Sequence, residues 1–116
     1  MEGKERDIFR LEHILESAEK IEKIVGQVGS LELFLDKWIE QDAMIRNFEI
    51  IGEASSHISD YTKGKYPQIE WYKLRGMRNL VAHEYFGIKL ETIWTTATTN
   101  IPVLKKQIQK TIAGLG

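Results

Sequence analysis

Apolar side chains recur every three or four residues along most of this chain, the spacing that places them on one face of an α-helix. The first such series runs from Ile8 to Val28. A second runs from about Leu31 to about Tyr61, with a possible break near Asp36. No segment shows the two-residue alternation that would indicate a half-buried strand. The pattern therefore predicts an all-α protein.

The second half of the chain keeps the helical spacing but contains residues that interrupt it. Residues Lys63 to Gln68 include a glycine and a proline and predict a loop. A shorter helix is expected from about Ile69 to His83. The last helix, Leu90 to Leu115, contains Pro102, which should kink it or start a new segment, because proline has no amide hydrogen and crowds the preceding turn.

Four helices with short connections predict an antiparallel four-helix bundle, built as a single domain over residues 1–116. The expected second helix would be about 45 Å long at 1.5 Å per residue, and the third about half of that. A short helix cannot cover a long one completely, so we expect apolar surface to remain for a partner. A homodimer is the commonest closed assembly and is our prediction.

Two glycines inside the expected helices indicate where backbones approach each other. Gly52 opens the small-residue segment Gly52–Ser56, and a glycine there weakens a helix by about 1 kcal/mol relative to alanine. Close packing of a neighbouring helix would offset that cost. Gly76, in the third helix, is also expected to let a backbone come close.

Composition narrows the class of protein further. The chain is 42% hydrophobic and 28% charged, which is ordinary for a globular domain and unlike a disordered one. Cysteine is absent, which excludes disulfides and thiolate zinc sites. The N-terminal segment lacks the apolar stretch of a signal peptide, and no apolar run approaches the roughly 20 residues that span a membrane. We therefore expect a cytoplasmic protein.

Charge is distributed unevenly, although the formal net charge of −1 argues against a broad cationic surface. Five cations lie between residues 63 and 78, against the single acid Glu70. These cations are Lys63, Lys65, Lys73, Arg75 and Arg78. The segment is either a solvated turn or a patch that binds phosphates.

The segment RNLVAHEYF, Arg78 to Phe86, combines a guanidinium, an amide, an imidazole and a phenol around a short apolar step. On an ideal helix at about 100° per residue, Arg78 lies about 140° from His83. The two side chains can converge if the helix ends near Ala82 and the chain turns. They can also converge across a two-fold axis between two subunits.

These groups have the chemistry needed to cleave RNA. Histidine exchanges a proton near neutral pH, and arginine is always charged and matches phosphate oxygens. RNA supplies its own nucleophile, the 2′-hydroxyl, so a base, an acid and a cation suffice without a metal. One His83 cannot easily be both acid and base in one step, whereas two copies across a dimer axis could be. The simpler alternative is a histidine that caps a helix end and an exposed arginine.

Other side chains have structural explanations. One stripe of the second helix is expected to form i,i+4 pairs in solvent, and Arg46 or Glu53 could also shape a cleft. That stripe comprises Arg46, Glu49, Glu53 and His57. The histidines lack metal-ligand spacing, so we expect no metal site: they are His13, His57 and His83. The tryptophans are expected in the core: Trp38, Trp71 and Trp94.

The sequence from Arg78 to Tyr85 matches the R-x4-H-x-Y signature and resembles HEPN domains, in particular the HepT-like toxin family. The resemblance covers most of the chain, because further segments agree with that family in order and spacing. These are Gln41–Ser55, the approach from Pro67 to Trp71, Gly76–Ile88, and Ile93 with Trp94. The signature alone is short, and its combination with these segments makes the resemblance specific.

The resemblance implies a four-helix HEPN fold and a homodimer whose motif lines a cleft between the subunits. It also implies a metal-independent ribonuclease toxin that needs no cofactor, with a minimal nucleotidyltransferase as its antitoxin. The motif match assigns catalytic roles to Arg78 and His83, and implies that the partner transfers AMP to Tyr85. Three nearby residues are expected to support RNA binding: Lys73, Arg75 and Asn79.

Two other functions are compatible with the sequence. The protein could be a non-catalytic nucleotide- or substrate-binding subunit of a nucleotidyltransferase, although binding alone does not require the imidazole. It could also be a helical dimerisation module in which the motif is polar by chance. The intact motif favours the ribonuclease over both.

Overall fold

The computed structural model describes residues 2–82 and 90–116, with side chains from Gly3 to Arg78 and from Leu90 onward. The regular elements in these ranges are all helical, with no strand among them. They are α1 (Glu2–Val28), α2 (Leu31–Phe34), α3 (Trp38–Ser56), α4 (Asp60–Lys65), α5 (Trp71–Ala82), α6 (Leu90–Thr95), the π-helical segment η2 (Thr96–Asn100) and α7 (Ile101–Leu115). The predicted all-α class is confirmed for this part of the chain.

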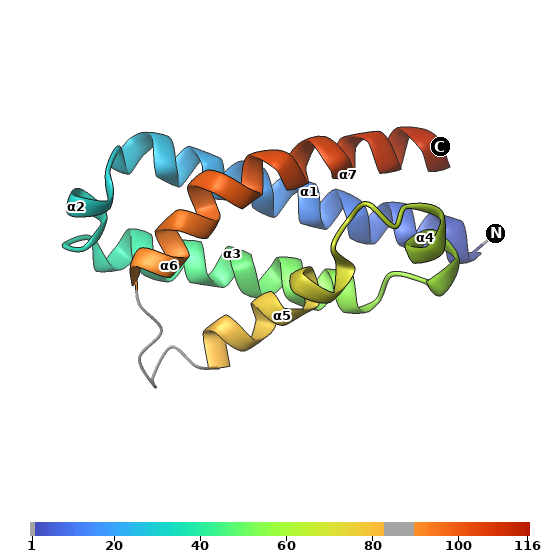
Figure 1. The fold of residues 1–116 in the computed structure, drawn as a ribbon, viewed down its shortest axis with the longest axis horizontal. Helices are drawn as coiled ribbons and strands as arrows, with labels where there is room; N and C mark the ends of the chain where they lie inside the picture. The colour runs from blue at the N-terminus through green and yellow to red at the C-terminus, as the bar shows by residue number, and fades with distance from the viewer. Residues whose placement is uncertain (1, 83–89) are drawn as a thin grey trace.

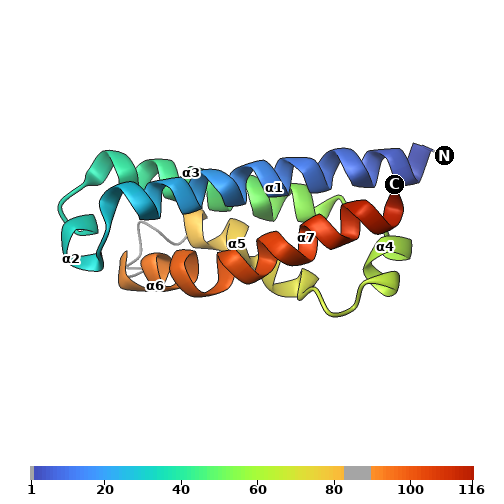
Figure 2. The ribbon, with the colours of Figure 1, turned by 90° about the horizontal axis from the view of Figure 1, so that it is seen from above.

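The longer helices lie along the longest dimension of the molecule and alternate in direction along the chain (Figure 1). α3 packs against both α1 and α5, and α1 also packs against α7. Seen from above, α6, η2 and α7 follow one another as a nearly continuous rod (Figure 2). α3 therefore connects α5, which carries the start of the R-x4-H-x-Y motif, to the rest of the fold.

One cluster of buried apolar side chains forms the core, and it is drawn from the predicted inward faces. Trp71 and Trp94 are buried as expected, each 9% exposed. Trp38 is 68% exposed, so its predicted place in the core is wrong. The reason is that Trp38 begins α3 after a turn and does not continue the face of α2. No helix in the described ranges is long and apolar enough to cross a membrane.

The second predicted helix is interrupted and shorter than expected. The break near Asp36 is present, because α2 ends at Phe34 and α3 begins at Trp38. The Gln41 side chain donates a hydrogen bond of 2.8 Å to the Phe34 carbonyl and so satisfies the end of α2. α3 ends at Ser56, and its 19 residues span about 28 Å at 1.5 Å per residue. The predicted length of 45 Å is therefore wrong.

Helix α4 begins at Asp60 and ends at Lys65, so it includes the first three residues of the segment Lys63–Gln68 that was predicted to be a loop. Ser59 caps it by accepting a hydrogen bond of 3.3 Å from the Thr62 amide. The buried carboxylate of Asp7, on α1, accepts a hydrogen bond of 3.0 Å from the Ser59 amide and further bonds from both hydroxyls. These partners are more than 50 residues apart in the sequence, so a local pattern could not reveal them.

Pro102 was predicted either to kink the last helix or to start a new segment, and it starts a new segment. It lies in the first turn of α7, directly after η2. Proline cannot donate to the carbonyl four residues back, and the Ile101 amide bonds to Thr96, five residues back. The wider π turn therefore accommodates the proline between two α-helices.

α3 and α5 approach each other closely at Gly52. A Cβ atom added to Gly52 would lie 2.5 Å from the backbone nitrogen of Arg78 and 3.1 Å from its Cα, so a side chain does not fit there. The predicted close approach at Gly52 is confirmed. A Cβ added to Gly76 would meet no atom of the described residues within 4 Å, so the close approach predicted there is wrong for this part of the chain.

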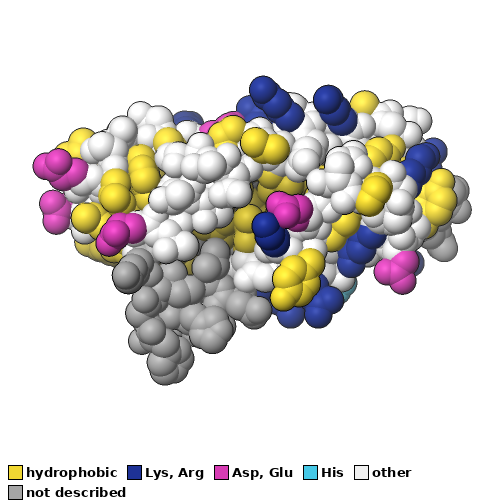
Figure 3. All heavy atoms as spheres, in the orientation of Figure 1, with side chains coloured by type: hydrophobic (Ala, Val, Ile, Leu, Met, Phe, Trp, Pro, Cys, Tyr) yellow, Lys and Arg dark blue, Asp and Glu magenta, His cyan; other side chains and the backbone are white. Residues whose placement is uncertain are grey.

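Gly76 is open because it lines a hollow of about 550 Å³ between α5 and the segment from η2 to α7. Apolar side chains, including Leu74, Met77 and Leu104, contribute to its lining. The space-filling view shows hydrophobic atoms in the hollowed middle of this face (Figure 3). α5 thus packs closely on α3 and leaves its other side open toward α7.

Replacing Gly52 by alanine is expected to lower the free energy of unfolding by about 1–3 kcal/mol, because overpacking costs more than the helix propensity that alanine gains. Gly26→Ala, in α1, is the matched control, since no atom that the structure describes lies within 4 Å of the added methyl. It should raise the free energy of unfolding by about 0.5–1 kcal/mol. Urea unfolding followed by circular dichroism measures both. An equal increase in the free energy of unfolding from the two substitutions would contradict the close contact between α3 and α5.

Candidate active site

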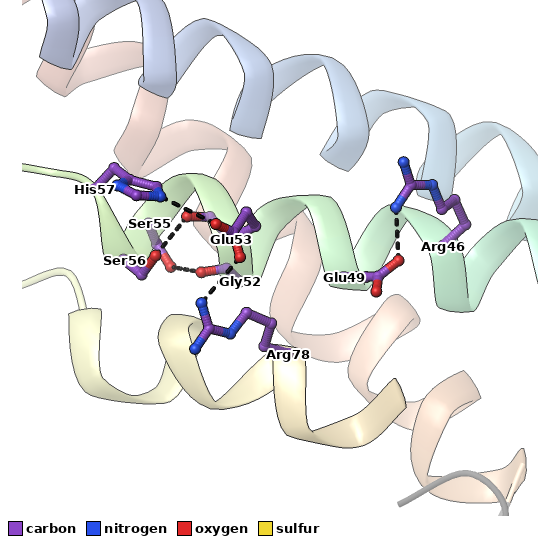
Figure 4. A network of polar contacts seen from close by, with 8 residues as sticks. All are labelled: Arg46, Glu49, Gly52, Glu53, Ser55, Ser56, His57 and Arg78. Carbon is purple, nitrogen blue, oxygen red and sulfur yellow. Dashed lines mark hydrogen bonds and ion pairs between the residues drawn. The ribbon is translucent and has the colours of Figure 1, made fainter. Parts of the chain in front are cut away.

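Four charged or titratable side chains form a row along the exposed side of α3 (Figure 4). Arg46 Nη1 lies 2.6 Å from Glu49 Oε1, and His57 Nε2 lies 3.0 Å from Glu53 Oε2. The members of each pair are one helical turn apart, so the pairing predicted from their spacing is confirmed. Exposed pairs of this kind add little to stability, and their consequence here is the orientation of the side chains.

Arg78 extends from α5 to the same row (Figure 4). Its Nη1 donates a hydrogen bond of 2.9 Å to Oε1 of Glu53, which lies 25 residues earlier in the chain. Gly52, the neighbour of Glu53, is where the backbone of α5 comes close to α3, so the helix contact brings guanidinium and carboxylate together. A guanidinium has five N–H donors, and this bond leaves others for a phosphate oxygen.

Glu53 is bonded by two cationic or titratable side chains at once. Hydrogen bonds from the His57 imidazole and then from the Arg78 guanidinium hold the pKa of the Glu53 carboxyl below its ordinary range. Glu53 is therefore ionised at neutral pH and able to hold Arg78. About half of the Glu53 side chain is exposed, so solvent and salt weaken these attractions without removing the hydrogen bonds.

Arg78 and Glu53 line a cleft of about 450 Å³ to which three helices contribute. Its charged or titratable lining residues are Arg10 and His13 from α1, Arg46, Glu49 and Glu53 from α3, and Arg78 from α5. Three guanidiniums and two carboxylates give the cleft a net positive charge. Arg46 and Glu53 were considered as cleft residues from the sequence, and the structure places both there.

This arrangement suits an anion such as a phosphodiester. Guanidiniums match phosphate oxygens in geometry and charge, and a neighbouring imidazole can donate or accept a proton near neutral pH. Within residues 3–78 and 90–116, no three His, Cys, Asp or Glu side chains come together as metal ligands would. The described part of the cleft thus provides cations for phosphate and carboxylates that orient them.

Two residues of the motif, His83 and Tyr85, lie outside the described residues, and so does the side chain of Asn79. The catalytic role of Arg78 with His83 and the modification of Tyr85 therefore remain predictions from the sequence.

Lys73 and Arg75, which were predicted to support RNA binding, are both exposed on α5. Lys73 pairs with Glu70 at 2.9 Å and lines the hollow on the side of α7. Arg78 lines the cleft with α1 and α3 instead. The structure therefore places Lys73 and Arg78 at two different concave surfaces on either side of α5.

Sequence reasoning did not identify Arg10 and His13 as cleft residues. On α1 they are one turn apart, at i and i+3, which places them on one side of the helix. That spacing is common on exposed helices and does not indicate a site. Only the packing of α1 against α3 places them in the same cleft as Arg78.

His57→Ala and Arg78→Ala are each expected to raise the pKa of Glu53, because each substitution removes a hydrogen bond to the carboxylate. A carboxyl whose pKa is lowered in the folded state stabilises the protein above its unfolded pKa, and loses that contribution as pH falls through the lowered value. NMR titration of the Glu53 carboxyl carbon measures the shift. An unchanged pKa in both variants would show that neither contact forms in solution.

Comparison with known proteins gives the family. A family model described as "Ribonuclease HepT-like" matches residues 14–111. "Probable ribonuclease HepT" of Thermococcus cleftensis is 38% identical over 100 residues, covering 86% of this chain and 90% of that protein. "Putative RNase MJ1380" of Methanocaldococcus jannaschii is 35% identical over 96 residues, covering 83% and 87%.

A third relative, "Putative RNase TTE0752" of Caldanaerobacter subterraneus subsp. tengcongensis, is 38% identical over 101 residues, covering 86% of this chain and 88% of that protein. No solved structure matches the chain. The family model covers most of the chain, including the described cleft residues of α3 and α5 and the whole R-x4-H-x-Y motif. This chain therefore belongs to the HepT-like ribonuclease family.

Proposed function

We propose that this protein is a metal-independent endoribonuclease that acts as the toxin of a toxin–antitoxin pair. The observation that carries the proposal is the complete R-x4-H-x-Y motif, Arg78 to Tyr85, within the residues that match the ribonuclease family. The relatives named as ribonucleases support the same activity. The net positive cleft around Arg78 supports RNA as the substrate.

The proposed reaction uses the 2′-hydroxyl of RNA as its nucleophile. A base removes the 2′ proton as the O2′–P bond forms, and an acid protonates the 5′ oxygen as the P–O5′ bond breaks. The products are a 2′,3′-cyclic phosphate and a 5′-hydroxyl. His83 transfers the protons, and Arg78 stabilises the negative charge that develops on the phosphorane. Glu53 holds the guanidinium toward the cleft.

Three further residues are proposed to support RNA binding: Lys73, Arg75 and Asn79. Lys73 lies on the other side of α5 from Arg78, so it would contact a phosphate beyond the reacting one. Lys73 and Arg75 are exposed cations on the helix that carries Arg78, which supports this role. Their contacts would be with phosphates and would carry no sequence information by themselves.

We also propose that the protein is a homodimer of HEPN-like antiparallel four-helix bundles, with the site completed across the two-fold axis. Two copies of His83 could then divide the roles of acid and base. The alternating direction of the helices supports the bundle (Figure 1). Large apolar side chains exposed near the junction of α2 and α3 support a contact between subunits: they are Leu33, Leu35, Trp38 and Ile39.

The proposed antitoxin is a minimal nucleotidyltransferase that transfers AMP to Tyr85 in the cytoplasm. The phenol oxygen would attack the α-phosphorus of ATP and release pyrophosphate, leaving AMP on the side chain. Tyr85 is two residues from His83 in the sequence, so each added nucleotide brings negative charge and bulk to the place where RNA phosphates must bind. The modification would therefore block the substrate.

A non-catalytic subunit that binds a nucleotide or substrate for a nucleotidyltransferase is the second candidate function. The observation in its favour is the cleft of about 450 Å³, since its cations would also hold the phosphates of a nucleotide. The two functions differ in a simple test. Expression of the chain alone should arrest growth if it is a ribonuclease toxin and should be tolerated if it only binds.

Purified wild-type protein is expected to cleave single-stranded RNA in the presence of EDTA, leaving 2′,3′-cyclic phosphate ends. His83→Ala should lower the rate about 10²- to 10⁴-fold, because proton transfer is lost. Arg78→Ala should lower it about 10²- to 10³-fold, because charge stabilisation is lost. Lys23 is an exposed cation of α1 outside the cleft lining, so Lys23→Ala is the control and should cleave RNA at the wild-type rate.

Gel electrophoresis gives these rates and mass spectrometry identifies the ends. RNA with a 2′-O-methyl group at the cleavage position should not be cleaved, because it lacks the 2′-hydroxyl nucleophile. Cleavage by His83→Ala at the wild-type rate would contradict the proposal. A strict requirement for an added metal would contradict the metal-independent reaction.

Incubation with the nucleotidyltransferase partner and ATP is expected to add AMP to Tyr85 and to abolish RNA cleavage. Mass spectrometry of peptides locates the addition. Tyr85→Phe should remain unmodified and should escape inhibition, whereas Tyr61→Phe, at an exposed tyrosine of α4, should behave as wild type. AMP found on another side chain, or inhibition that persists in Tyr85→Phe, would show that regulation does not act through this phenol.

A further inference from the structure

The cleft that contains Arg78 extends beyond the motif onto α1. Arg10 and His13 line it, although they come at least 65 residues before Arg78 in the sequence. They also precede residues 14–111, the span that matches the family model, so that match assigns them no role. Their place in the structure therefore indicates what they do.

The guanidiniums of the cleft differ in their partners. Arg46 pairs with Glu49 at 2.6 Å, and Arg78 pairs with Glu53 at 2.9 Å. Among the described side chains, no carboxylate lies within ion-pairing distance of Arg10. Arg10 thus adds positive charge at the α1 wall that no described carboxylate offsets through direct contact.

An exposed aromatic ring lies next to this wall. The Phe9 ring packs against the His13 ring with 4.5 Å between centroids and a tilt of 50°. His13 lines the cleft, and Phe9 is 56% exposed. Phe9 therefore offers an aromatic face to solvent near the α1 side of the cleft, held in place by its contact with the imidazole.

These three side chains offer what one nucleotide of a single strand requires. A guanidinium binds the phosphate, an imidazole can donate a hydrogen bond to a phosphate or base, and an exposed aromatic ring can stack on a base. Stacking platforms combined with a cationic groove are the usual means by which proteins bind single-stranded RNA. A duplex would leave the aromatic ring unused, because its bases are already stacked.

We propose that Phe9, Arg10 and His13 form a nucleotide subsite for single-stranded RNA, next to the phosphodiester that Arg78 binds. This inference rests on the proposed function for the identity of the ligand. Arg10 contacts a phosphate that flanks the scissile one, and Phe9 stacks on the adjoining base. The strand thus lies across α3, from α5 to α1, and the subsite contributes binding rather than proton transfer.

The test measures binding of an RNA oligonucleotide methylated at every 2′ oxygen, which cannot be cleaved by its own hydroxyl. Arg10→Ala should weaken binding about tenfold and reduce the salt slope of log K by about 0.7, the loss of one phosphate contact on a single strand. Phe9→Ala should weaken binding about 5- to 100-fold with an unchanged salt slope. Lys23→Ala, at an exposed lysine 13 residues further along α1 than Arg10 and outside the cleft lining, is the control for general loss of charge.

Substitutions at Phe9 separate stacking from packing. Phe9→Tyr keeps the aromatic face and should bind as wild type, whereas Phe9→Leu keeps apolar volume and should bind like Phe9→Ala. Size-exclusion chromatography is run on each variant. A change of oligomeric state in Phe9→Ala would assign Phe9 to a contact between proteins and overturn the stacking role.

Cleavage is measured separately, so that the subsite and the proposed function can fail independently. In cleavage assays, Arg10→Ala and Phe9→Ala should raise KM and leave kcat nearly unchanged, since uniform binding is lost. RNA binding that is the same in Arg10→Ala, Phe9→Leu and wild type would overturn the subsite even if the wild type cleaves RNA. Binding that depends on both residues, without any cleavage, would support the subsite and contradict the ribonuclease.

Discussion

The close contact between Gly52 and the backbone of Arg78 is the constraint on which the described site depends. A methyl group at Gly52 would lie 2.5 Å from the Arg78 nitrogen, so α3 and α5 can adopt this separation only with glycine there. The next residue, Glu53, then reaches the guanidinium at 2.9 Å. The same packing places Arg78 at the wall of the cleft that α1 and α3 also line. The helix contact at Gly52, the ion pair between Arg78 and Glu53, and the position of Arg78 in the cleft thus depend on one another.

The sequence predicts the helices well where their stability comes from a continuous apolar face, as in α1, whose three- and four-residue spacing matches its buried side. It fails where distant residues decide the structure. Asp7 on α1 accepts hydrogen bonds from Ser59 and Thr62, and these bonds fix α4, whose last three residues were expected in a loop. Trp38 has the correct spacing for the core but is exposed, because the chain turns before it. Local periodicity carries no information about either effect.

The residues of the candidate site also divide into those that a local sequence pattern reveals and those that only the packing of helices reveals. Arg78 was found from the motif, and Glu53 and Arg46 from their stripe on one helix, since both signals are local. Arg10 and His13 could not be found, because only the packing of α1 on α3 brings them to the cleft. Gly52 and Gly76 look alike in the sequence, yet one faces a backbone and the other a hollow. A nearly neutral chain thus gathers a local positive charge that its total charge of −1 does not show.

The most direct test is a crystal structure of His83→Ala bound to a short RNA with a 2′-deoxy nucleotide at the cleavage position. The site described here predicts that the scissile phosphate lies within hydrogen-bonding distance of the Arg78 guanidinium, in the cleft between α1, α3 and α5, with Glu53 still bonded to that guanidinium. The scissile phosphate bound beside Lys73 in the hollow toward α7, with Arg78 in contact only with Glu53, would contradict it.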